Sequence, residues 1–180
     1  MIYELSSDYF VRSFRESDLD GPYRTWFEDQ DVCRFNSHGK LFRNEMYFKA
    51  FWEGLNQHDR MVWAICHCRD GHIGNISLQS ISAINRNAEF AILLGDKRHW
   101  GLGVGKLAGH RLLQHGFDKL NLARVSCGTA AINEGMRRLA LSLGFREEGC
   151  RRAHLWLEGA WVDVVEYGIL RDEFAVERLL

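Results

Sequence analysis

Apolar and polar residues alternate along much of the chain with the two-residue period of a β-strand, and elsewhere with the wider period of an α-helix. The strand pattern covers residues 9–15, 61–68, 73–80, 87–94, 124–129, 146–157 and 161–170. The helical pattern covers residues 17–27, 43–57, 103–120 and 133–143, and Gly21-Pro22 interrupts the first of these segments. Strands and helices in this order predict an α/β protein built around one sheet.

Length and composition fit one domain. The 180 residues are 46% hydrophobic and 26% charged, and we expect a single domain over residues 1–180 with a sizeable core. The longest apolar run, residues 61–66, is too short to cross a membrane, and the first ten residues lack the features of a secretory signal. The net charge of −1 argues against nucleic-acid binding through bulk charge. We therefore expect a cytoplasmic protein that binds neither membrane nor nucleic acid.

The spacing of cysteine and histidine favours neither disulfides nor a metal site. The five cysteines include no C-x-x-C pair, and Cys66 and Cys68 would lie too far apart along one strand face for a disulfide. No histidine pairs with another, or joins a cysteine cluster, at a zinc spacing. The sequence thus predicts reduced thiols and no metal.

The strongest local feature is the segment Arg98-His99-Trp100-Gly101-Leu102-Gly103-Val104-Gly105, which lies between a strand and a helix. Its glycines let a ligand approach the backbone closely, and the helix N-terminus offers unpaired N–H groups and the positive end of the helix dipole. Arg98 adds a fixed positive charge. These features predict a phosphate or pyrophosphate site, and a tight turn that needs glycine for packing is the alternative.

Two nucleotide-binding motifs fit this segment poorly. Gly103-x-Gly105-x-x-Ala108 matches a dinucleotide fingerprint, but residues 122–128 include no acidic residue that could bind a ribose. A P-loop also fails, because Leu107 stands where that motif requires Ser or Thr. A dinucleotide-dependent oxidoreductase is therefore the least favoured of three hypotheses for the chain.

The motifs taken together resemble the GNAT superfamily of N-acetyltransferases. Arg98-x-x-Gly101-x-Gly103 is similar to the acyl-CoA pyrophosphate loop of that family. The segment from Asn133 to Gly144-Phe145 is similar to its second motif. The opening residues 14–18 and the closing residues 159–173 resemble the RimJ/RimL-type branch.

The resemblance implies an α/β (α+β) fold with acetyl-CoA as co-substrate. The implied fold is a central mixed, mostly antiparallel, seven-stranded sheet flanked by about four helices, with the fourth and fifth strands splayed apart. Acetyl-CoA would enter the gap between those strands. Its pantetheine arm would pair with the backbone of Ile92, Leu93 and Leu94. Its diphosphate would bind the loop formed by Arg98, Trp100, Gly101, Leu102, Gly103, Val104 and Gly105. Asn133 would hydrogen-bond the pantetheine arm, cap the following helix, or do both.

Acetyl transfer to an amine is helped by a base, by polarisation of the thioester carbonyl and by a proton donor for the departing thiolate. Glu89 is the candidate base, because it lies on a central strand beside the expected thioester; a salt bridge with Arg86 or Arg124 is the alternative. Many family members carry a tyrosine seven residues after the motif asparagine, but this chain has Ala140 there. The remaining polar candidates for the catalytic acid are Cys127 and Ser142, although Cys127 also fits a buried, unreactive thiol.

The acceptor side is expected before the second strand of the sequence pattern. Asn36 and His38 are its candidate residues, and the aromatic residues of segment 43–57 either wall a pocket or fill the core. The resemblance implies an N-acetyltransferase, monomeric or homodimeric, that moves an acetyl group directly to a small-molecule or peptide amine. The acceptor would be a protein N-terminus or a small amine such as an amino-sugar nucleotide. Because the motif tyrosine is missing, a non-catalytic acyl-CoA-binding module is the second hypothesis.

Overall fold

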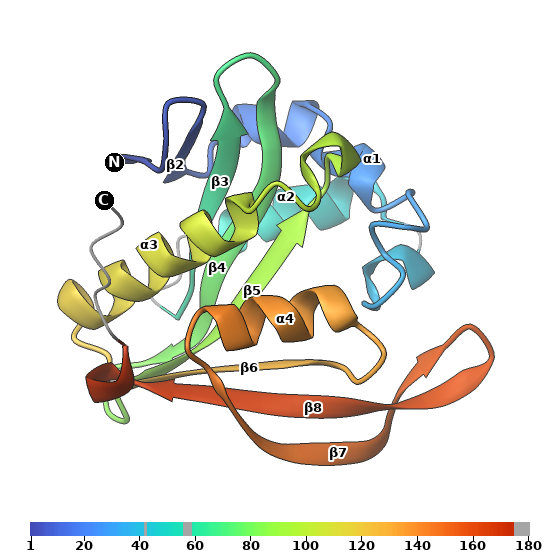
Figure 1. The fold of residues 1–180 in the computed structure, drawn as a ribbon. Helices are drawn as coiled ribbons and strands as arrows, with labels where there is room; N and C mark the ends of the chain where they lie inside the picture. Colours follow the sequence, from blue (N-terminus) through green and yellow to red (C-terminus); the bar gives the residue numbers. More distant parts are fainter. Residues whose placement is uncertain (42, 56–58, 175–180) are drawn as a thin grey trace.

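A single eight-stranded sheet forms the centre of the molecule in the computed structural model, which describes residues 1–41, 43–55 and 59–174 (Figure 1). The strands are β1 (Ile2–Glu4), β2 (Tyr9–Ser13), β3 (Met61–His67), β4 (Gly71–Ser82), β5 (Asn87–Leu94), β6 (Arg124–Ala130), β7 (Arg146–Leu157) and β8 (Ala160–Leu170). Their order is β1-β2-β3-β4-β5-β6-β8-β7. All neighbours pair antiparallel except β5 and β6, which pair parallel. The mixed, mostly antiparallel sheet is confirmed.

The predicted count of seven strands is wrong by one, because β1 was missed. This strand has three residues, and only its central residue, Tyr3, is half-buried. A segment of this length has too few positions to show an alternating pattern. What defines β1 is its hydrogen-bonded pairing with β2, which the sequence pattern does not show.

Four α-helices accompany the sheet, as predicted. They are α1 (Tyr23–Trp26), α2 (Glu45–Gly54), α3 (Val104–Asp118) and α4 (Glu134–Ser142). Short 3₁₀ turns lie at η1 (Glu16–Asp20), η2 (His38–Lys40), η3 (Lys97–His99) and η4 (Arg171–Glu173). The predicted helical segment 17–27 is divided at Gly21-Pro22 into η1 and α1, and the end of the predicted segment 43–57 lies outside the described residues.

Helices cover both faces of the sheet, with α3 and α4 on one face and α1 and α2 on the other (Figure 1). The first face forms a large apolar cluster that includes Ile76, Phe90, Val104, Leu112 and Val125. The second face forms a smaller, aromatic cluster that includes Phe14, Tyr23, Trp26, Phe48 and Ala64. The sheet therefore separates two differently built halves of the molecule.

The parallel pair at the centre of the sheet is short. β5 and β6 pair only where residues 87–89 face residues 124–126, and beyond Glu89 and Ser126 the two strands diverge (Figure 1). The splayed pair expected from the family resemblance is thus confirmed. With β1 counted, the strands concerned are the fifth and sixth in the chain. The edge of β5 that follows Glu89 faces a gap instead of a neighbouring strand.

A buried ion pair secures the turn that leads from β2 into α1. Arg12 donates from Nη2 to Asp18 Oδ1 at 2.6 Å and from Nη1 to Asp18 Oδ2 at 2.7 Å, and the Arg15 N–H donates to Asp18 Oδ2 at 2.8 Å. Only 5% of the Asp18 side chain is exposed. Burial acts to raise the pKa of Asp18, but the hydrogen bonds from Arg12 and Arg15 outweigh it and hold that pKa below its ordinary value.

We expect Asp18→Asn to lower the free energy of unfolding by about 3 kcal/mol, because Arg12 would lose its buried partner. The contribution of Asp18 is complete above the ordinary carboxyl pKa of about 3.9 and is lost as the pH falls through the lower pKa of the folded state. Urea unfolding between neutral and acidic pH measures both effects. The control is Glu45→Gln, which removes an exposed partner of Arg24. An equal, small loss from both variants would contradict the assignment.

Candidate functional site

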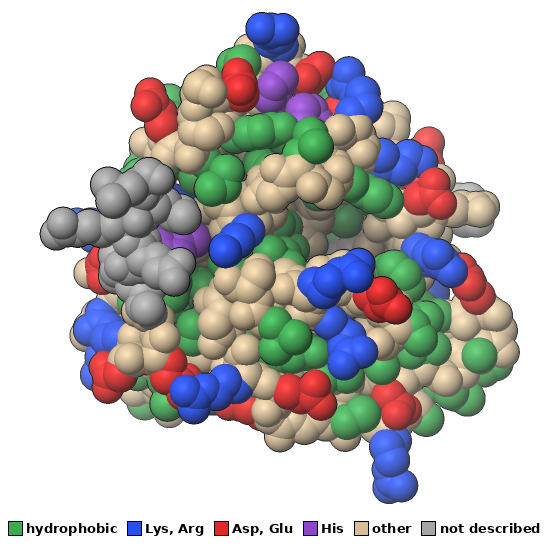
Figure 2. Space-filling view, viewed as in Figure 1, with side chains coloured by type: hydrophobic (Ala, Val, Ile, Leu, Met, Phe, Trp, Pro, Cys, Tyr) green, Lys and Arg blue, Asp and Glu red, His purple; other side chains and the backbone are tan. Residues whose placement is uncertain are grey.

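The gap between β5 and β6 opens into a cleft of about 1170 Å³. Its lining comes from the α3–α4 half and from the α1–α2 half of the molecule, so the cleft reaches both faces of the sheet. The surface is hollowed on the face shown in Figure 2, and basic side chains border the hollow. The cleft is large enough for an elongated ligand that passes from one face to the other.

The glycine loop forms one wall of this cleft. Gly101 and Gly103 have φ angles of +74° and +80°, in the left-handed region that favours glycine. Gly103 stands immediately before α3, and the loop is held to the end of β5 by a hydrogen bond of 2.8 Å from Trp100 Nε1 to the Leu94 carbonyl oxygen. The loop is therefore bent by its glycines and anchored by its tryptophan.

Backbone N–H groups of the loop are available to a ligand. Within the described residues, no protein oxygen accepts a hydrogen bond from the N–H groups of residues 101–105, as expected for the start of a helix. The N–H of Trp100 differs, because it donates to the Lys97 carbonyl oxygen at 3.1 Å. Gly101, Gly103, Val104 and Gly105 all line the cleft. The arrangement has the features of the anion sites found at helix N-termini.

Two loop residues that were predicted to bind the diphosphate lie outside the cleft lining. Arg98 is absent from the cleft lining, and its guanidinium binds Asp96, with Nη2 and Oδ2 2.6 Å apart, and Asp70, with Nη1 and Oδ1 3.1 Å apart. Leu102 is also outside the lining, and its side chain is 61% exposed. Binding of a phosphate by the Arg98 guanidinium or by the Leu102 N–H stays a prediction.

The predicted pantetheine-binding residues are all in the cleft lining. Ile92, Leu93 and Leu94 form the part of β5 that has no β6 partner. Asn133 lies across the cleft, where its Oδ1 accepts a hydrogen bond from the Met136 N–H at 3.1 Å. This contact confirms the helix-capping role of Asn133, and its amide NH₂ remains available to donate toward a ligand.

Glu89 stands at the point where the two strands separate. It is the last β5 residue paired with β6, and its exposed side chain lines the cleft. The alternative salt bridges are not formed, because Arg124 binds Glu148 and Arg86 binds Asn121. Among the described residues, Glu89 has no cationic partner. Its carboxylate is therefore free to accept a proton from a group in the cleft.

The other catalytic candidates fit less well. Cys127 is 1% exposed within the large apolar cluster, and its burial, together with the charges of Glu166 and Glu89, raises the pKa of its thiol to about 12. Cys127 is therefore the buried, unreactive thiol of the two alternatives. Ser142 does line the cleft, but its hydroxyl donates to the Leu139 carbonyl oxygen at 2.8 Å. Ala140 is fully buried in the same apolar cluster.

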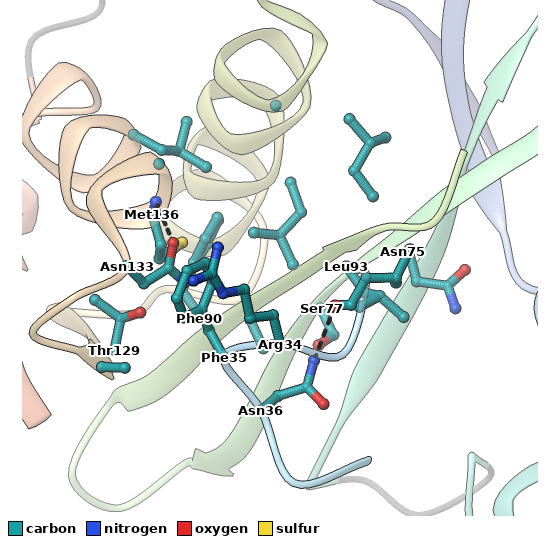
Figure 3. Close-up of a pocket in the computed structure, with 18 of the residues that line it drawn as sticks. Arg34, Phe35, Asn36, Asn75, Ser77, Phe90, Leu93, Thr129, Asn133 and Met136 are labelled. Atoms are coloured by element: carbon teal, nitrogen blue, oxygen red, sulfur yellow. Dashed lines mark hydrogen bonds between the residues drawn. The ribbon is translucent and has the colours of Figure 1, made fainter. Parts of the chain in front are cut away.

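The acceptor side of the cleft includes one of the two predicted residues. Asn36 lines the cleft, and its Nδ2 donates to the Val32 carbonyl oxygen at 3.4 Å (Figure 3). His38 lies in η2, and the placement of its side chain is outside the described part of the chain. The aromatic segment serves both predicted purposes, since Tyr47 and Phe51 line the cleft while Phe48 is buried in the core.

A row of polar side chains on β4 was missed in the sequence. Asn75, Ser77 and Gln79 line the cleft, and the strand register places them opposite Leu93, Ala91 and Glu89 on one face of the sheet (Figure 3). Asn75 and Ser77 are buried, and Asn75 Oδ1 lies 2.7 Å from Nε2 of the buried His72. The alternation of these residues with Ile76 and Leu78 was the signal that could have revealed them.

Charged side chains of the lining are mostly basic. The cleft includes the cationic residues Arg34, Lys106, Arg138 and Arg151 but only two carboxylates, Asp31 and Glu89. Asp31 is bound by Lys97, with its Oδ2 2.8 Å from Nζ. The cleft therefore offers one carboxylate without a cationic partner in the described residues.

None of the helices in the described ranges combines the length and the apolar character needed to cross a membrane. All five cysteines are free, as the sequence predicts.

Related proteins match a large part of the chain. YdaF of Bacillus subtilis (strain 168) is 34% identical over 110 residues, which are 61% of this chain and 60% of that protein. The spermidine N(1)-acetyltransferase of Vibrio cholerae is 31% identical over 149 residues, covering 83% of this chain and 80% of that protein. The chain thus spans only about three-fifths of YdaF, but four-fifths of the second relative.

Solved structures share the fold. A spermidine N-acetyltransferase from Vibrio cholerae, in complex with CoA and spermine, superposes with a TM-score of 0.84 at 21% identity and covers 94% of this chain and 99% of its own. RimL, a ribosomal L7/L12 α-N-protein acetyltransferase in complex with coenzyme A, also has a TM-score of 0.84, at 20% identity, with coverages of 96% and 99%.

The family model described as the acetyltransferase (GNAT) domain matches residues 9–146. This range includes the strands that diverge, the glycine loop and the whole of α4. The chain therefore belongs to the GNAT acetyltransferase family.

Proposed function

We propose that this protein transfers the acetyl group of acetyl-CoA directly to a primary amine. The observation that carries the proposal is the opening of the sheet at Glu89, which places a carboxylate without a cationic partner in the same cleft as a row of free loop N–H groups. Both features line one cleft, so a thioester held by the loop and strand would meet the carboxylate. Acetyl-CoA supplies the activated acyl group, and the protein supplies its binding and the proton acceptor.

Acetyl-CoA fits the groups that the cleft presents. The N–H groups of residues 101–105 would bind its diphosphate, where α3 adds the positive end of its dipole. Residues 92–94 present an unpaired strand edge to the pantetheine arm, and Asn133 lies across the cleft from them. Lys106 adds a positive charge to the same lining.

Glu89 would act as the general base. An amine attacks only when neutral, and a lysine-like ammonium with a pKa near ~10.4 is mostly protonated at neutral pH. A carboxylate at the fork of β5 and β6 can take the amine proton, directly or through a water molecule. The attack forms the new C–N bond, and loss of the C–S bond releases the CoA thiolate, which takes a proton from solvent or from a nearby hydroxyl.

The acceptor would be an amine with neutral or anionic substituents, such as a protein N-terminus or an amino-sugar nucleotide. A polyamine carries several positive charges and calls for several carboxylates. Of the two carboxylates that the described lining contains, Asp31 is bound by Lys97, and Glu89 has no cationic partner. Of its four cationic side chains, Arg34, Arg138 and Arg151 are themselves paired with Glu158, Glu134 and Glu166. Because some relatives are named for spermidine and others for a ribosomal protein, both classes belong in the test.

Thiol release from acetyl-CoA in the presence of different amines tests the proposal. We expect turnover with peptides that carry a free N-terminus or with amino-sugar nucleotides, and at least about tenfold lower kcat/KM with spermidine. Saturable CoA binding without turnover on any amine would instead identify a non-catalytic acyl-CoA-binding module. Submicromolar NADH binding without CoA binding would support an oxidoreductase and overturn the proposal.

We expect Glu89→Gln to lower kcat roughly a hundredfold or more and to leave the KM for acetyl-CoA almost unchanged, because the base acts in the chemical step. Steady-state kinetics with the best acceptor measure this split. Glu147→Gln is the control, since Glu147 lies on β7 outside the cleft lining. Unchanged turnover in Glu89→Gln would remove this residue from the mechanism.

We expect Gly103→Val to raise the KM for acetyl-CoA about tenfold or more, because valine at a φ of +80° is strained and would displace the loop. Calorimetric binding of CoA checks that the change lies in cofactor binding. Gly159→Val is the matched control: Gly159 has a φ of +83° in the turn between β7 and β8, and at both glycines the space that a Cβ would occupy is open. A similar loss in both variants would show that the loop is misassigned.

A further inference from the structure

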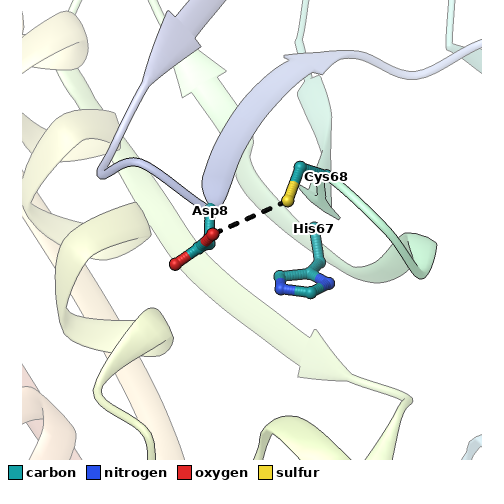
Figure 4. A group of neighbouring side chains, drawn as sticks. All are labelled: Asp8, His67 and Cys68. Atoms are coloured by element: carbon teal, nitrogen blue, oxygen red, sulfur yellow. Dashed lines mark hydrogen bonds between the residues drawn. The ribbon is translucent and has the colours of Figure 1, made fainter.

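Three side chains of different chemistry meet beside the hairpin between β3 and β4, outside the cleft lining. Asp8 immediately precedes β2, while His67 ends β3 and Cys68 follows it (Figure 4). One ligand atom from each residue lies within 4.8 Å of the other two, and Cys68 Sγ is 3.7 Å from Asp8 Oδ1. A carboxylate, an imidazole and a thiol therefore converge on one point.

The backbone fixes this convergence. Tyr9 is paired with His67 across the two strands, and the Cys68 N–H donates to the Asp8 carbonyl oxygen at 2.8 Å. The three side chains thus rise from neighbouring backbone positions that hydrogen bonds hold in register. Asp8 and Cys68 are exposed, so their side chains have room to rotate toward a bound ion.

A fourth residue orients the histidine. Asp70 contacts His67 at Nδ1, where Oδ2 lies 2.6 Å away and the Asp70 N–H donates at 3.3 Å, so Nε2 is the nitrogen left for a cation. A carboxylate behind a histidine is the usual outer contact of zinc-binding imidazoles. Asp70 is itself held by Arg98, with Nη1 and Oδ1 3.1 Å apart. Asp70 therefore holds the imidazole from its Nδ1 side.

We propose that Asp8, His67 and Cys68 bind one zinc ion, with Asp70 as a positioning residue and water in the fourth place. A thiolate beside an imidazole favours zinc over magnesium or calcium, which prefer oxygen ligands. Zinc bonds of about 2.0–2.3 Å place tetrahedral ligand atoms roughly 3.5 Å apart, so the side chains close by about 1 Å. Binding releases the Cys68 proton, and the charges of the thiolate and the Asp8 carboxylate then balance that of the ion.

The chain provides a matched control for this assignment. Cys150 is also exposed, and its Sγ lies 3.7 Å from Asp163 Oδ2, which is the same contact that Cys68 makes with Asp8. Among the described residues, however, Cys150 and Asp163 do not belong to a group of three metal-ligating side chains. Cys150→Ala therefore removes an equivalent thiol without touching the proposed site.

Titration of the reduced, metal-free protein with Co²⁺, followed by competition with Zn²⁺, tests the proposal. We expect one Co²⁺ per chain, a thiolate-to-cobalt charge-transfer band, and displacement by Zn²⁺. Cys68→Ala should abolish the charge-transfer band, and Cys150→Ala should leave it unchanged. Asp8→Asn and His67→Gln should each weaken binding at least about tenfold, and Asp70→Asn by about 10- to 100-fold without loss of the charge-transfer band.

Thermal unfolding of the metal-free variants verifies that each one is folded before titration. A wild-type protein that shows no charge-transfer band would overturn the proposal. So would a band that persists in Cys68→Ala or disappears in Cys150→Ala. These readouts do not depend on acetyl transfer, so they decide the zinc site whatever the outcome of the amine tests.

Discussion

The incomplete pairing of β5 and β6 is the constraint on which the site depends. Two parallel strands that paired along their whole length would close the sheet and bury the edge of β5. Here the pairing stops at Glu89 and Ser126, so the following residues of β5 keep an edge that a ligand can bind. The cost of leaving backbone groups without a strand partner is tolerable because the edge lines an open cleft, where water or a ligand can satisfy it.

The same opening connects two halves of the molecule with different chemistry. On the α3–α4 side, the loop offers backbone N–H groups and the dipole of α3, which suit a diphosphate. On the other side, β4 contributes Asn75 and Ser77, and α2 contributes Tyr47 and Phe51. A transferase must bind the donor and the acceptor in separate places and still bring their reacting atoms into contact. In the proposed function, a sheet with a gap would do this with one layer of backbone, because each substrate would approach from its own face.

Sequence periodicity located the long elements because each buries a regular face, as with Val104, Ala108 and Leu112 of α3. It missed β1, whose three residues form no pattern. It also could not show which side chains the loop residues contact in the folded protein. Arg98 illustrates the second problem: its type and place suggested a phosphate ligand, yet the fold brings Asp70 from a hairpin beyond the sequence neighbourhood. The row of Asn75, Ser77 and Gln79 was visible as alternation, but such a row normally marks a water-facing strand. Only the tertiary structure shows that it faces a cleft.

The group of Asp8, His67 and Cys68 was hidden for a related reason. Zinc motifs are read from the spacing of ligands along the chain, whereas Asp8 joins the other two only through the register of β2 against β3. The consequence extends to the loop, because Asp70 contacts both His67 and Arg98, and His99 Nε2 lies 3.3 Å from the same carboxylate. A cation bound to His67 would attract the Asp70 carboxylate. The contacts of that carboxylate with Arg98 and His99 would then change. The hairpin between β3 and β4 is therefore linked physically to the glycine loop, although neither Asp70 nor His67 lines the cleft.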